Sequence, residues 1–231
     1  CKSSGTLPNT GTDYFLFGNK AEAVAKENNI LFSVNWVEGQ KTGFFLDQRE
    51  NRKLLGEFSK GKKVLNTFCY TGGFSIYAMS AGAELVTSVD ISQKAVDLAA
   101  SNMELNFPNA NHKAVADDVF NFMKEHTQQY DVIVLDPPAF AKSIKSKHTA
   151  TQAYKRLNIA GLKALAPNGI LFTFSCSQVI DDVLFYNTVA AAAIETGRNI
   201  RVLHKLEQGP DHPTNIYHPE GHYLKGLVLF V

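Results

Sequence analysis

Two reactive side chains follow apolar runs directly, and they are the first sign of chemistry in the sequence. Asp136 comes after Val132–Leu135 and opens an Asp-Pro-Pro-Ala-Phe segment, and Cys176 stands just beyond Ile170–Phe174. Consecutive prolines cannot continue a strand ladder, so the chain must leave the sheet stiffly at Asp136. If the two runs are parallel neighbours, their ends meet at one edge, where a thiol of lowered pKa can act as a nucleophile.

This arrangement suits a nucleobase as substrate. Asp136 and the carbonyl groups that follow it, beginning with that of Pro137, can hydrogen-bond the edge of a base, and Phe140 offers a stacking face. Carbon 5 of cytosine is a poor nucleophile, and thiolate addition at carbon 6 makes it an enamine-like one, which is a reason to place Cys176 here. The plainer interpretation is a proline-rich turn with a capping Asp and an inert, packed thiol.

A nucleotide-like ligand is indicated by the turn 66–75, Asn-Thr-Phe-Cys-Tyr-Thr-Gly-Gly-Phe-Ser. Gly72 and Gly73 let a ligand approach the backbone, and the following helix presents free N–H groups. Asp90 ends the next strand and can take the hydroxyls of a ribose, and Asp118 after the third strand can receive an adenine amino group. A helix-capping Asp90 is the plain alternative. The fingerprint GxGxxG is absent, which argues against a nicotinamide or flavin cofactor.

A cationic segment separates Asp136 from Asp181, because no acidic residue lies between them. A net charge near +1 gives no global attraction to nucleic acid, but a local basic surface beside a site can bind phosphates. The alternative is a solvated helix face. The basic residues of this segment are Lys142, Lys145, Lys147, Lys155, Arg156 and Lys163.

From Val64 onward, short apolar runs alternate with helical patterns, which predicts an α/β fold with a doubly wound, largely parallel sheet of about seven strands. Within Ser92–Leu105, apolar residues recur at helical spacing and Ser92 is a plausible N-cap. The expected strands are Val64–Phe68, Leu85–Val89, Val115 with its neighbours, Val132–Leu135, Ile170–Phe174, Ile200–Leu203 and Leu227–Val231.

The first sixty residues have a different pattern. Ile30–Val37 is predicted to be a strand, Glu38–Gly43 a turn and Phe44–Leu46 a returning strand, so that a β-hairpin precedes the sheet. A helix is expected over Asp47–Phe58.

Composition bounds the class of protein. The 231 residues are 45% hydrophobic and 19% charged, as expected for a globular enzyme with one large domain. No uncharged apolar run is long enough to cross a membrane, and Cys1–Gly11 is too polar for a signal peptide. Because the chain does not begin with Met, we expect a domain to be missing upstream.

The cysteines and histidines give no metal motif. Cys1, Cys69 and Cys176 have no paired spacing, which favours free thiols in a reducing cytoplasm, and Cys69 is expected to pack under the glycine turn. Pro219 and Gly221 prevent the helix that would direct His218 and His222 at one ion, so no metal is expected.

The combination of motifs resembles the bacterial large-subunit ribosomal RNA cytosine-C5 methyltransferases over roughly Val24 to Val231. The resemblance is carried by residues 39–52 (Gly-Gln-Lys-Thr-Gly-Phe-Phe-Leu-Asp-Gln-Arg-Glu-Asn-Arg), the glycine turn, Asp-Pro-Pro-Ala-Phe, Phe-Ser-Cys-Ser, Asp211-His212-Pro213 and residues 220–226 (Glu-Gly-His-Tyr-Leu-Lys-Gly).

The resemblance implies S-adenosylmethionine as methyl donor, an antiparallel last strand and 5-methylcytosine in ribosomal RNA as product. Carried over by motif, Gln48 and Arg49 lie near the donor's amino-acid end, Asp90 holds its ribose and Asp118 its adenine. Cys176 is then the nucleophile and Asp136 orients the cytosine. The residues of the turn that hold the donor's backbone are Tyr70, Thr71, Gly72 and Gly73, and those expected near the RNA are Pro137, Phe140, Lys142 and Lys145.

Members of that family usually carry an N-terminal PUA domain and a longer β-rich linker domain. Residues 1–46 are interpreted as a hairpin remnant of the linker, and residues 47–231 as the methyltransferase domain. Two rivals stay open: an enzyme that methylates an amine or ring nitrogen of guanine or adenine through Asp-Pro-Pro, and a non-catalytic RNA-binding module. The oligomeric state is not predicted.

Overall fold

The computed structural model describes residues 18, 20–37, 39, 43–141 and 143–231. Its centre is a seven-stranded sheet with the strand order β5-β4-β3-β6-β7-β9-β8. The strands of this sheet are β3 (Lys63–Thr67), β4 (Leu85–Asp90), β5 (His112–Ala116), β6 (Tyr130–Leu135), β7 (Leu165–Ser175), β8 (Arg201–Leu206) and β9 (Lys225–Phe230). The expected strand count is confirmed, with boundaries that differ mostly by one to three residues and by five at the start of β7.

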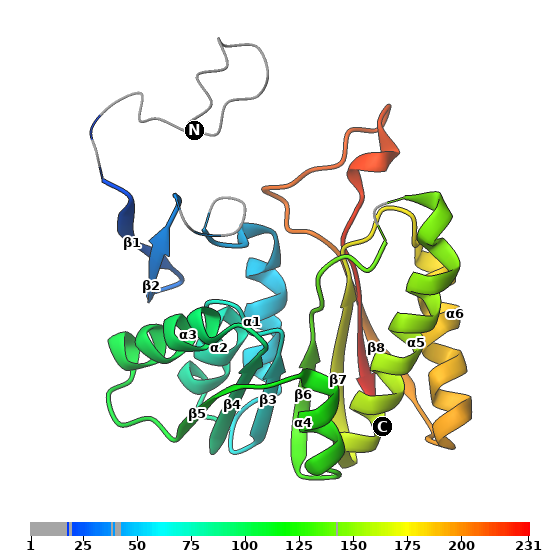
Figure 1. Cartoon of the computed structure of the whole chain (residues 1–231), viewed down its shortest axis with the longest axis horizontal. Coiled ribbons are helices and arrows are strands. Elements are labelled where there is room, and N and C mark those ends of the chain that lie inside the picture. Colours follow the sequence, from blue (N-terminus) through cyan, green and yellow to red (C-terminus); the bar gives the residue numbers. More distant parts are fainter. Residues whose placement is uncertain (1–17, 19, 38, 40–42, 142) are drawn as a thin grey trace.

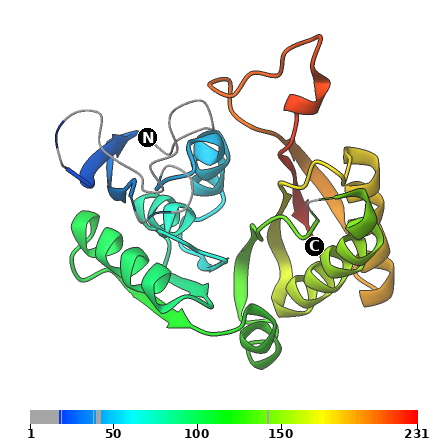
Figure 2. The ribbon, with the colours of Figure 1, turned by 45° about the horizontal axis from the view of Figure 1, so that its top comes forward.

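Helices cover both faces of the sheet (Figures 1 and 2). One layer contains α1 (Arg49–Glu57), α2 (Gly73–Ser80) and α3 (Gln93–Asn106), and the other contains α4 (Val119–Glu125), α5 (Lys147–Ala164) and α6 (Asp182–Thr196). The short 3-10 helices are η1 (Leu46–Gln48), η2 (Ile144–Ser146) and η3 (Pro219–Gly221). Ser92 caps α3 as expected, because its hydroxyl accepts a hydrogen bond from the Ala95 N–H.

Side chains alternate between the two faces along each strand, and so contribute to two hydrophobic cores. In β6, Ile133 belongs to the core beneath α4, α5 and α6, while Val132 and Val134 belong to the core on the other face. Successive side chains of a strand point to opposite faces, so a sheet covered on both sides needs apolar residues at nearly every position. That requirement explains the continuous apolar runs of the sequence.

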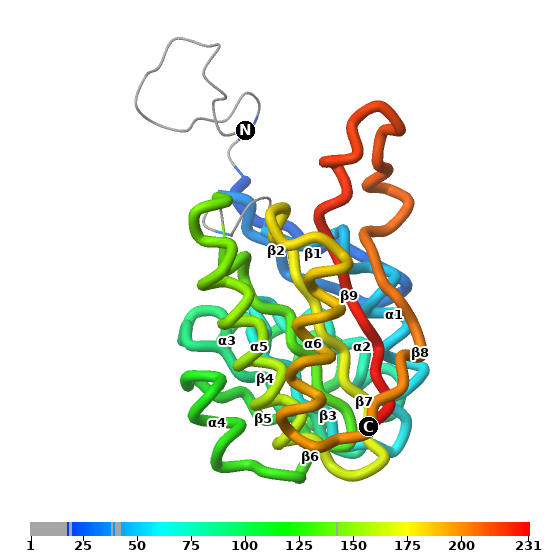
Figure 3. The backbone as a smooth tube through the Cα atoms, turned by 90° about the vertical axis from the view of Figure 1, so that its right-hand side faces the viewer, coloured from blue at the N-terminus to red at the C-terminus, as the bar shows by residue number. Residues whose placement is uncertain are grey.

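The last strand runs against the others. Strands β3 to β7 pair in parallel, whereas β9 inserts between β7 and β8 and pairs antiparallel with both. The antiparallel strand places Lys225, at the start of β9, opposite Ser175, at the end of β7. Residues 207–224 therefore lie beyond the carboxyl edge of the parallel strands, where Figure 3 shows them projecting as a long excursion.

The predicted hairpin is present, but its position was wrong. It pairs β1 (Glu22–Glu27) with β2 (Ile30–Asn35), and Phe44–Leu46 is not a returning strand. Asn28 and Asn29 have φ values of 48° and 68°, the left-handed conformation that a tight two-residue hairpin turn requires and that Asn tolerates. Most of the expected turn 38–43 lies outside the described residues.

Two asparagines of α3 fix the hairpin to the domain. Asn106 accepts from the Leu31 N–H and donates to the Leu31 carbonyl, and Asn102 accepts from the Ser33 N–H. Asn102 also donates to the Thr71 carbonyl at 3.0 Å, so one amide joins the hairpin to the glycine turn. Within the part of the chain that the structure describes, no helix is long and apolar enough to cross a membrane.

Candidate active site

The strand ends bring Cys176 to the Asp-Pro-Pro segment, as the sequence predicted. The Cys176 thiol, half-buried, lies 3.9 Å from the Pro137 carbonyl oxygen. Ser177 supports this contact because its hydroxyl donates to the Ala141 carbonyl at 2.8 Å. The two segments that leave β6 and β7 are therefore tied together on either side of the thiol.

Asp136 is held from the beginning of α1. The Gln48 side-chain amide donates to Asp136 Oδ2 at 3.1 Å, and Asn51 donates to Gln48 Oε1 at 2.7 Å. Asn51 also donates to the Glu207 carbonyl, which connects the same chain of bonds to the C-terminal excursion. Gln48 is only 4% exposed, so its amide is fixed for orienting the Asp136 carboxylate.

Aromatic rings form the wall behind the thiol. The Phe140 ring is half-buried and its centroid lies 4.7 Å from that of Tyr154 on α5. Burial raises the pKa of Tyr154 to about 12, so this phenol stays protonated near neutral pH. Phe140 also packs against the hydrophobic core.

The second described cysteine has a different environment. Cys69 is 5% exposed, and burial, with the Asp90 carboxylate adding to it, raises the pKa of its thiol far above the usual range. A thiol of this kind is inert as a nucleophile. The expectation that Cys69 packs beneath the glycine turn is confirmed.

The glycine turn has an unusual backbone. Phe68, Tyr70 and Gly72 all have positive φ values, of 53°, 46° and 80°. A Cβ at Gly72 would lie 3.0 Å from the Ala99 Cβ in addition to its left-handed φ, and a Cβ at Gly73 would lie 3.0 Å from the Arg52 Cδ. Gly72 is thus favoured by its left-handed φ and by the close packing of the turn on α3, whereas a Cβ at Gly73 would require a small shift of the Arg52 side chain.

Asp90 organises the same turn. Its Oδ2 accepts from the Tyr70 N–H at 3.1 Å and its Oδ1 accepts from the Ser92 N–H at 3.0 Å. The Tyr70 hydroxyl donates to the Gly43 carbonyl at 3.3 Å, and its ring packs edge-on against Phe45. Thr71 is buried, with its carbonyl held by Asn102.

Asp118 lies at the N-terminus of α4 as its N-cap. Its Oδ1 accepts from the N–H groups of Phe120 and Asn121, at 3.0 and 3.1 Å. Both capping bonds use one oxygen of the carboxylate. Phe120, 37% exposed, lies beside it.

Asp47 is a site residue that the sequence analysis missed. Its Oδ2 accepts a 2.6 Å hydrogen bond from the Tyr223 hydroxyl, and its buried Oδ1 has no hydrogen-bond partner among the described residues. Burial is the largest cause that raises the pKa of Tyr223, and the hydrogen bond to Asp47 raises it further. An unpaired buried carboxylate oxygen is costly, so it suits a cationic amino group from a ligand. Asp47 directly precedes Gln48 in the segment 39–52, and this position could have indicated a role in the site.

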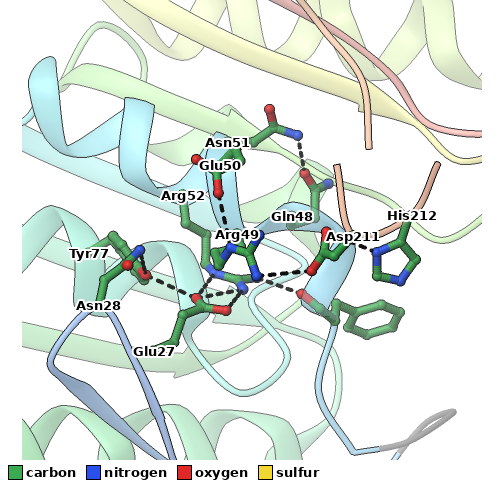
Figure 4. Close-up of polar contacts among 11 residues, drawn as sticks. Glu27, Asn28, Gln48, Arg49, Glu50, Asn51, Arg52, Tyr77, Asp211 and His212 are labelled. Atoms are coloured by element: carbon green, nitrogen blue, oxygen red, sulfur yellow. Dashed lines mark hydrogen bonds and ion pairs between the residues drawn. The ribbon is translucent and has the colours of Figure 1, made fainter. Parts of the chain in front are cut away.

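Arg49 faces the C-terminal excursion. Its guanidinium bonds Glu50 Oε1 and Asp211 Oδ2, both at 3.0 Å, and His212 lies 3.2 Å from the same Asp211 carboxylate (Figure 4). The Arg49 side chain therefore connects the start of α1 to the excursion. Partly exposed pairs of this kind contribute little to stability on their own.

The cationic segment is partly neutralised by its neighbours. Lys147 lies 3.6 Å from Asp181, and Lys155 lies 2.6 Å from Glu195 on α6. Lys145 is exposed in η2. Lys142 lies outside the described residues.

The three C-terminal histidines each lie near carboxylates. His212 faces Asp211, His218 faces Glu220 at 3.3 Å, and His222 faces Asp182 at 3.2 Å. Among the described residues, no group of three or more His, Cys, Asp or Glu side chains could hold a metal ion.

Similar proteins were found among sequences and structures. A family model described as S-adenosylmethionine-dependent methyltransferase matches residues 8–228. "Ribosomal RNA large subunit methyltransferase I" of Aeromonas hydrophila is 42% identical over 99% of this chain, and that of Vibrio vulnificus is 44% identical over 90%. The matched regions are 58% and 54% of those proteins, so the chain spans about half the length of the curated relatives it matches.

Two solved structures are similar over nearly the whole chain. A candidate SAM-dependent methyltransferase from Streptococcus mutans is 29% identical with a TM-score of 0.83, covering 94% of this chain and 57% of the other. A second structure, of a candidate methyltransferase complexed with SAH, is 30% identical with a TM-score of 0.82 and covers 94% of this chain and 58% of its own.

Proposed function

Because the chain belongs to the family of S-adenosylmethionine-dependent methyltransferases, we propose that it forms 5-methylcytosine in large-subunit ribosomal RNA through a covalent Cys176 adduct. Family membership confirms the expected enzyme class, the expected methyl donor and the resemblance found from the motifs. The observation that carries the finer proposal is the Cys176 thiol beside the Pro137 carbonyl, next to an Asp136 held by Gln48. The names of the curated relatives support ribosomal RNA as the substrate.

The described residues fit S-adenosylmethionine at the strand edge formed by β3, β4 and η1. The buried, unpartnered Asp47 Oδ1 suits the donor's amino group, with Gln48 and Arg49 beside it. The turn from Tyr70 to Gly73 holds the donor's chain, and Asp90 and Asp118 hold its ribose and adenine in this proposal. When bound, this cofactor supplies an electrophilic methyl group carried on a sulfonium.

Cys176 prepares the base for that methyl group. Its thiolate adds to carbon 6 of the cytosine, so that the electrons of the 5,6 double bond become available at carbon 5. Asp136 accepts a hydrogen bond from the exocyclic amino group, and from ring nitrogen 3 once that nitrogen is protonated, which stabilises the electron shift. The Pro137 carbonyl and Phe140 position the ring. After methylation, loss of the carbon 5 proton to a base re-forms the double bond and expels the Cys176 thiolate.

The wider assignments follow from the same proposal. In this proposal residues 47–231 are the methyltransferase domain and residues 1–46 are a separate N-terminal segment, whose described part contains the hairpin of β1 and β2. Three residues of the hairpin, Ile30, Phe32 and Val34, share one core with α1 and β3, which supports a fixed attachment. Lys145 contacts RNA phosphates in this proposal, and a ribosomal substrate would suit a cytoplasmic protein.

The direct test is nucleoside mass spectrometry of unmodified large-subunit ribosomal RNA after incubation with the chain and isotopically labelled S-adenosylmethionine. Label in 5-methylcytosine supports the proposal. Label in guanine or adenine would instead establish amine or ring-nitrogen methylation through Asp136. Donor binding without any label, on both naked RNA and ribosomal particles, would contradict catalysis by this chain alone, and absence of donor binding would favour an RNA-binding role.

Replacement of Cys176 by Ala tests the covalent step. We expect Cys176→Ala to lose 5-methylcytosine formation by at least about 1,000-fold, because the nucleophile is gone, while the affinity for S-adenosylmethionine changes less than about twofold. Initial rates of label transfer and calorimetric titration of the donor measure the two quantities. Cys69→Ala is the matched control and should retain the rate. A Cys176→Ala enzyme of wild-type rate would exclude the covalent scheme.

A further inference from the structure

A buried lysine lies behind the candidate nucleophile. Lys225, at the start of β9, is 3% exposed, and the remainder of that strand is apolar except for Gly226. Its ammonium donates to the Ser177 carbonyl at 2.8 Å and to the Tyr223 carbonyl at 2.7 Å. A buried charge is expensive unless it is bonded and compensated, so a lysine at this position needs a physical reason.

The position of this lysine is set by the strand register. Lys225 pairs across the sheet with Ser175, and its ammonium binds the carbonyl of Ser177. Cys176 is the residue between these two anchors. The lysine therefore holds the backbone on both sides of the thiol, in a turn that the Ser177 hydroxyl fastens to Ala141.

The ammonium has no carboxylate partner within 4 Å among the described residues, although Asp181 and Asp182 act on it from the start of α6. Burial lowers the pKa of Lys225, whereas Asp182, Cys176 and Asp181 act in the opposite direction. Such interactions are reciprocal: a thiolate at Cys176 favours the ammonium, and the ammonium favours the thiolate.

The other ionisable groups around this turn do not supply that charge. The carboxyl groups of Asp136, Asp181 and Asp182 carry no positive charge, so none of them favours a neighbouring thiolate. The phenols of Tyr154 and Tyr223 both have raised pKa values. Lys147 lies near Asp181, and His222 lies near Asp182. Lys225 is the buried cation on the side of β9.

We propose that Lys225 is a positioning residue for Cys176: its ammonium fixes the Ser177 carbonyl and thereby the thiol, and it stabilises the thiolate that attacks the base. The proton released from the thiol passes to solvent, and Lys225 keeps its own. The role in methylation rests on the proposed function, but the effect on the thiol is a property of the folded chain alone.

The test is the pH dependence of Cys176 alkylation by iodoacetamide, quantified on the Cys176 peptide by mass spectrometry without RNA or donor. In Lys225→Met we expect the midpoint of the rate profile to rise by about one pH unit or more, with a rate near pH 7 about tenfold lower. Lys225→Arg, which keeps a cation, should stay near the wild-type profile. Thr173→Val, a neutral change at a buried β7 position, is the matched control and should not move the midpoint.

Circular dichroism and donor binding establish that each variant is folded. If Lys225→Met does not fold, Lys225→Gln replaces it, because its shorter neutral side chain keeps an N–H donor. A folded Met or Gln variant with the wild-type midpoint overturns the proposal, and so does an Arg variant that behaves like Met. Because alkylation needs no substrate, a failure of RNA methylation would leave this result unaffected, and a wild-type midpoint would leave the proposed methylation standing.

Discussion

The same residue type has two different environments in this chain. Cys69 and Cys176 both follow apolar strands, yet Cys69 is buried beside Asp90, whereas Cys176 is half-buried at a turn beside a lysine. A thiol is reactive only where its anion is stabilised and accessible. The neighbours of each cysteine, rather than its sequence motif, therefore separate the candidate nucleophile from the packing residue.

At Asp47, we expect Asp47→Asn to weaken S-adenosylmethionine binding about tenfold to hundredfold, the range of one charge-assisted hydrogen bond. The substituted amide oxygen can still accept the bond from Tyr223, so the fold should persist. Calorimetric titration measures the affinity. Asp131→Asn is the control, since Asp131 accepts from the Lys63 N–H at the other end of the sheet. Equal affinities for Asp47→Asn and the wild type would remove Asp47 from the donor site.

At the scale of elements, the hairpin is attached by a buried ion pair. Arg52 on α1 donates to Glu27 on β1 through three hydrogen bonds of 2.7 to 3.0 Å, and Tyr77 on α2 donates to the same carboxylate (Figure 4). The guanidinium also lies 4.6 Å from the Phe44 ring centroid. Two helices and the hairpin thus meet at one carboxylate directly behind the glycine turn.

Glu27→Ala should therefore destabilise the chain by about 3–5 kcal/mol, because it leaves the Arg52 guanidinium buried without its counter-charge. Urea denaturation followed by circular dichroism measures the free energy of unfolding. Glu22→Ala, on the same strand but with an exposed bond to Asn35, should change it by less than about 0.5 kcal/mol. Similar losses for both variants would show that the ion pair has no special role.

A buried polar chain runs beneath the glycine turn. Asn66 donates to Ser75 Oγ, which lies 2.6 Å from Ser88 Oγ, and Ser88 in turn lies 2.8 Å from His112 Nε2. Burial lowers the pKa of His112 to about 4, against 6.5 when the residue is free. Between these values the unfolded chain binds the proton and the folded chain does not.

This difference predicts a stability that falls with acid. The contribution of neutral His112 is present above about pH 6.5 and is lost as the pH falls toward about 4. Relative to His112→Gln, the wild type should lose about 1–2 kcal/mol of unfolding free energy between pH 7 and pH 4.5, after allowance for partial exposure. Urea titrations at both pH values measure it. Ser88→Ala keeps the imidazole and should keep this pH dependence; an equal slope for His112→Gln would contradict the assignment.

At the scale of the whole molecule, electrostatics would limit how the proposed RNA substrate is bound. The net charge of about +1 gives little general attraction, and part of the cationic segment is already paired with Asp181 and Glu195. Under the proposed function, affinity for RNA would come from a few phosphate contacts near the site.

The salt dependence of the RNA affinity measures the number of phosphate contacts. Lys145→Ala should reduce the slope of log affinity against log salt by about 0.7 for single-stranded RNA, the release expected for one phosphate contact. Fluorescence anisotropy over a range of salt concentrations measures the slope. Lys155→Ala, whose amine is bound to Glu195 at 2.6 Å, is the control and should leave the slope unchanged. Identical slopes for Lys145→Ala and the wild type would place Lys145 away from the RNA.

The amino-acid sequence by itself determined the elements and most of the edge they form. Apolar periodicity predicted all seven strands, Ser92 was identified as a cap, and the Asp-Pro-Pro and Cys176 segments were placed at neighbouring strand ends. These features depend on local patterns and on the rule that parallel strands end at one edge. The hairpin was misplaced because the turn at Asn28 and Asn29 has no glycine or proline to mark it.

Only the tertiary structure decided which distant side chains meet at the site. The free oxygen of Asp47, the Lys225 ammonium on the Ser177 carbonyl and the pairing of Lys147 and Lys155 depend on register and sheet order between segments far apart in the chain. No periodicity encodes such contacts, because each is created when the antiparallel β9 and the helices pack on the sheet. Their chemistry therefore belongs to the fold rather than to any one motif.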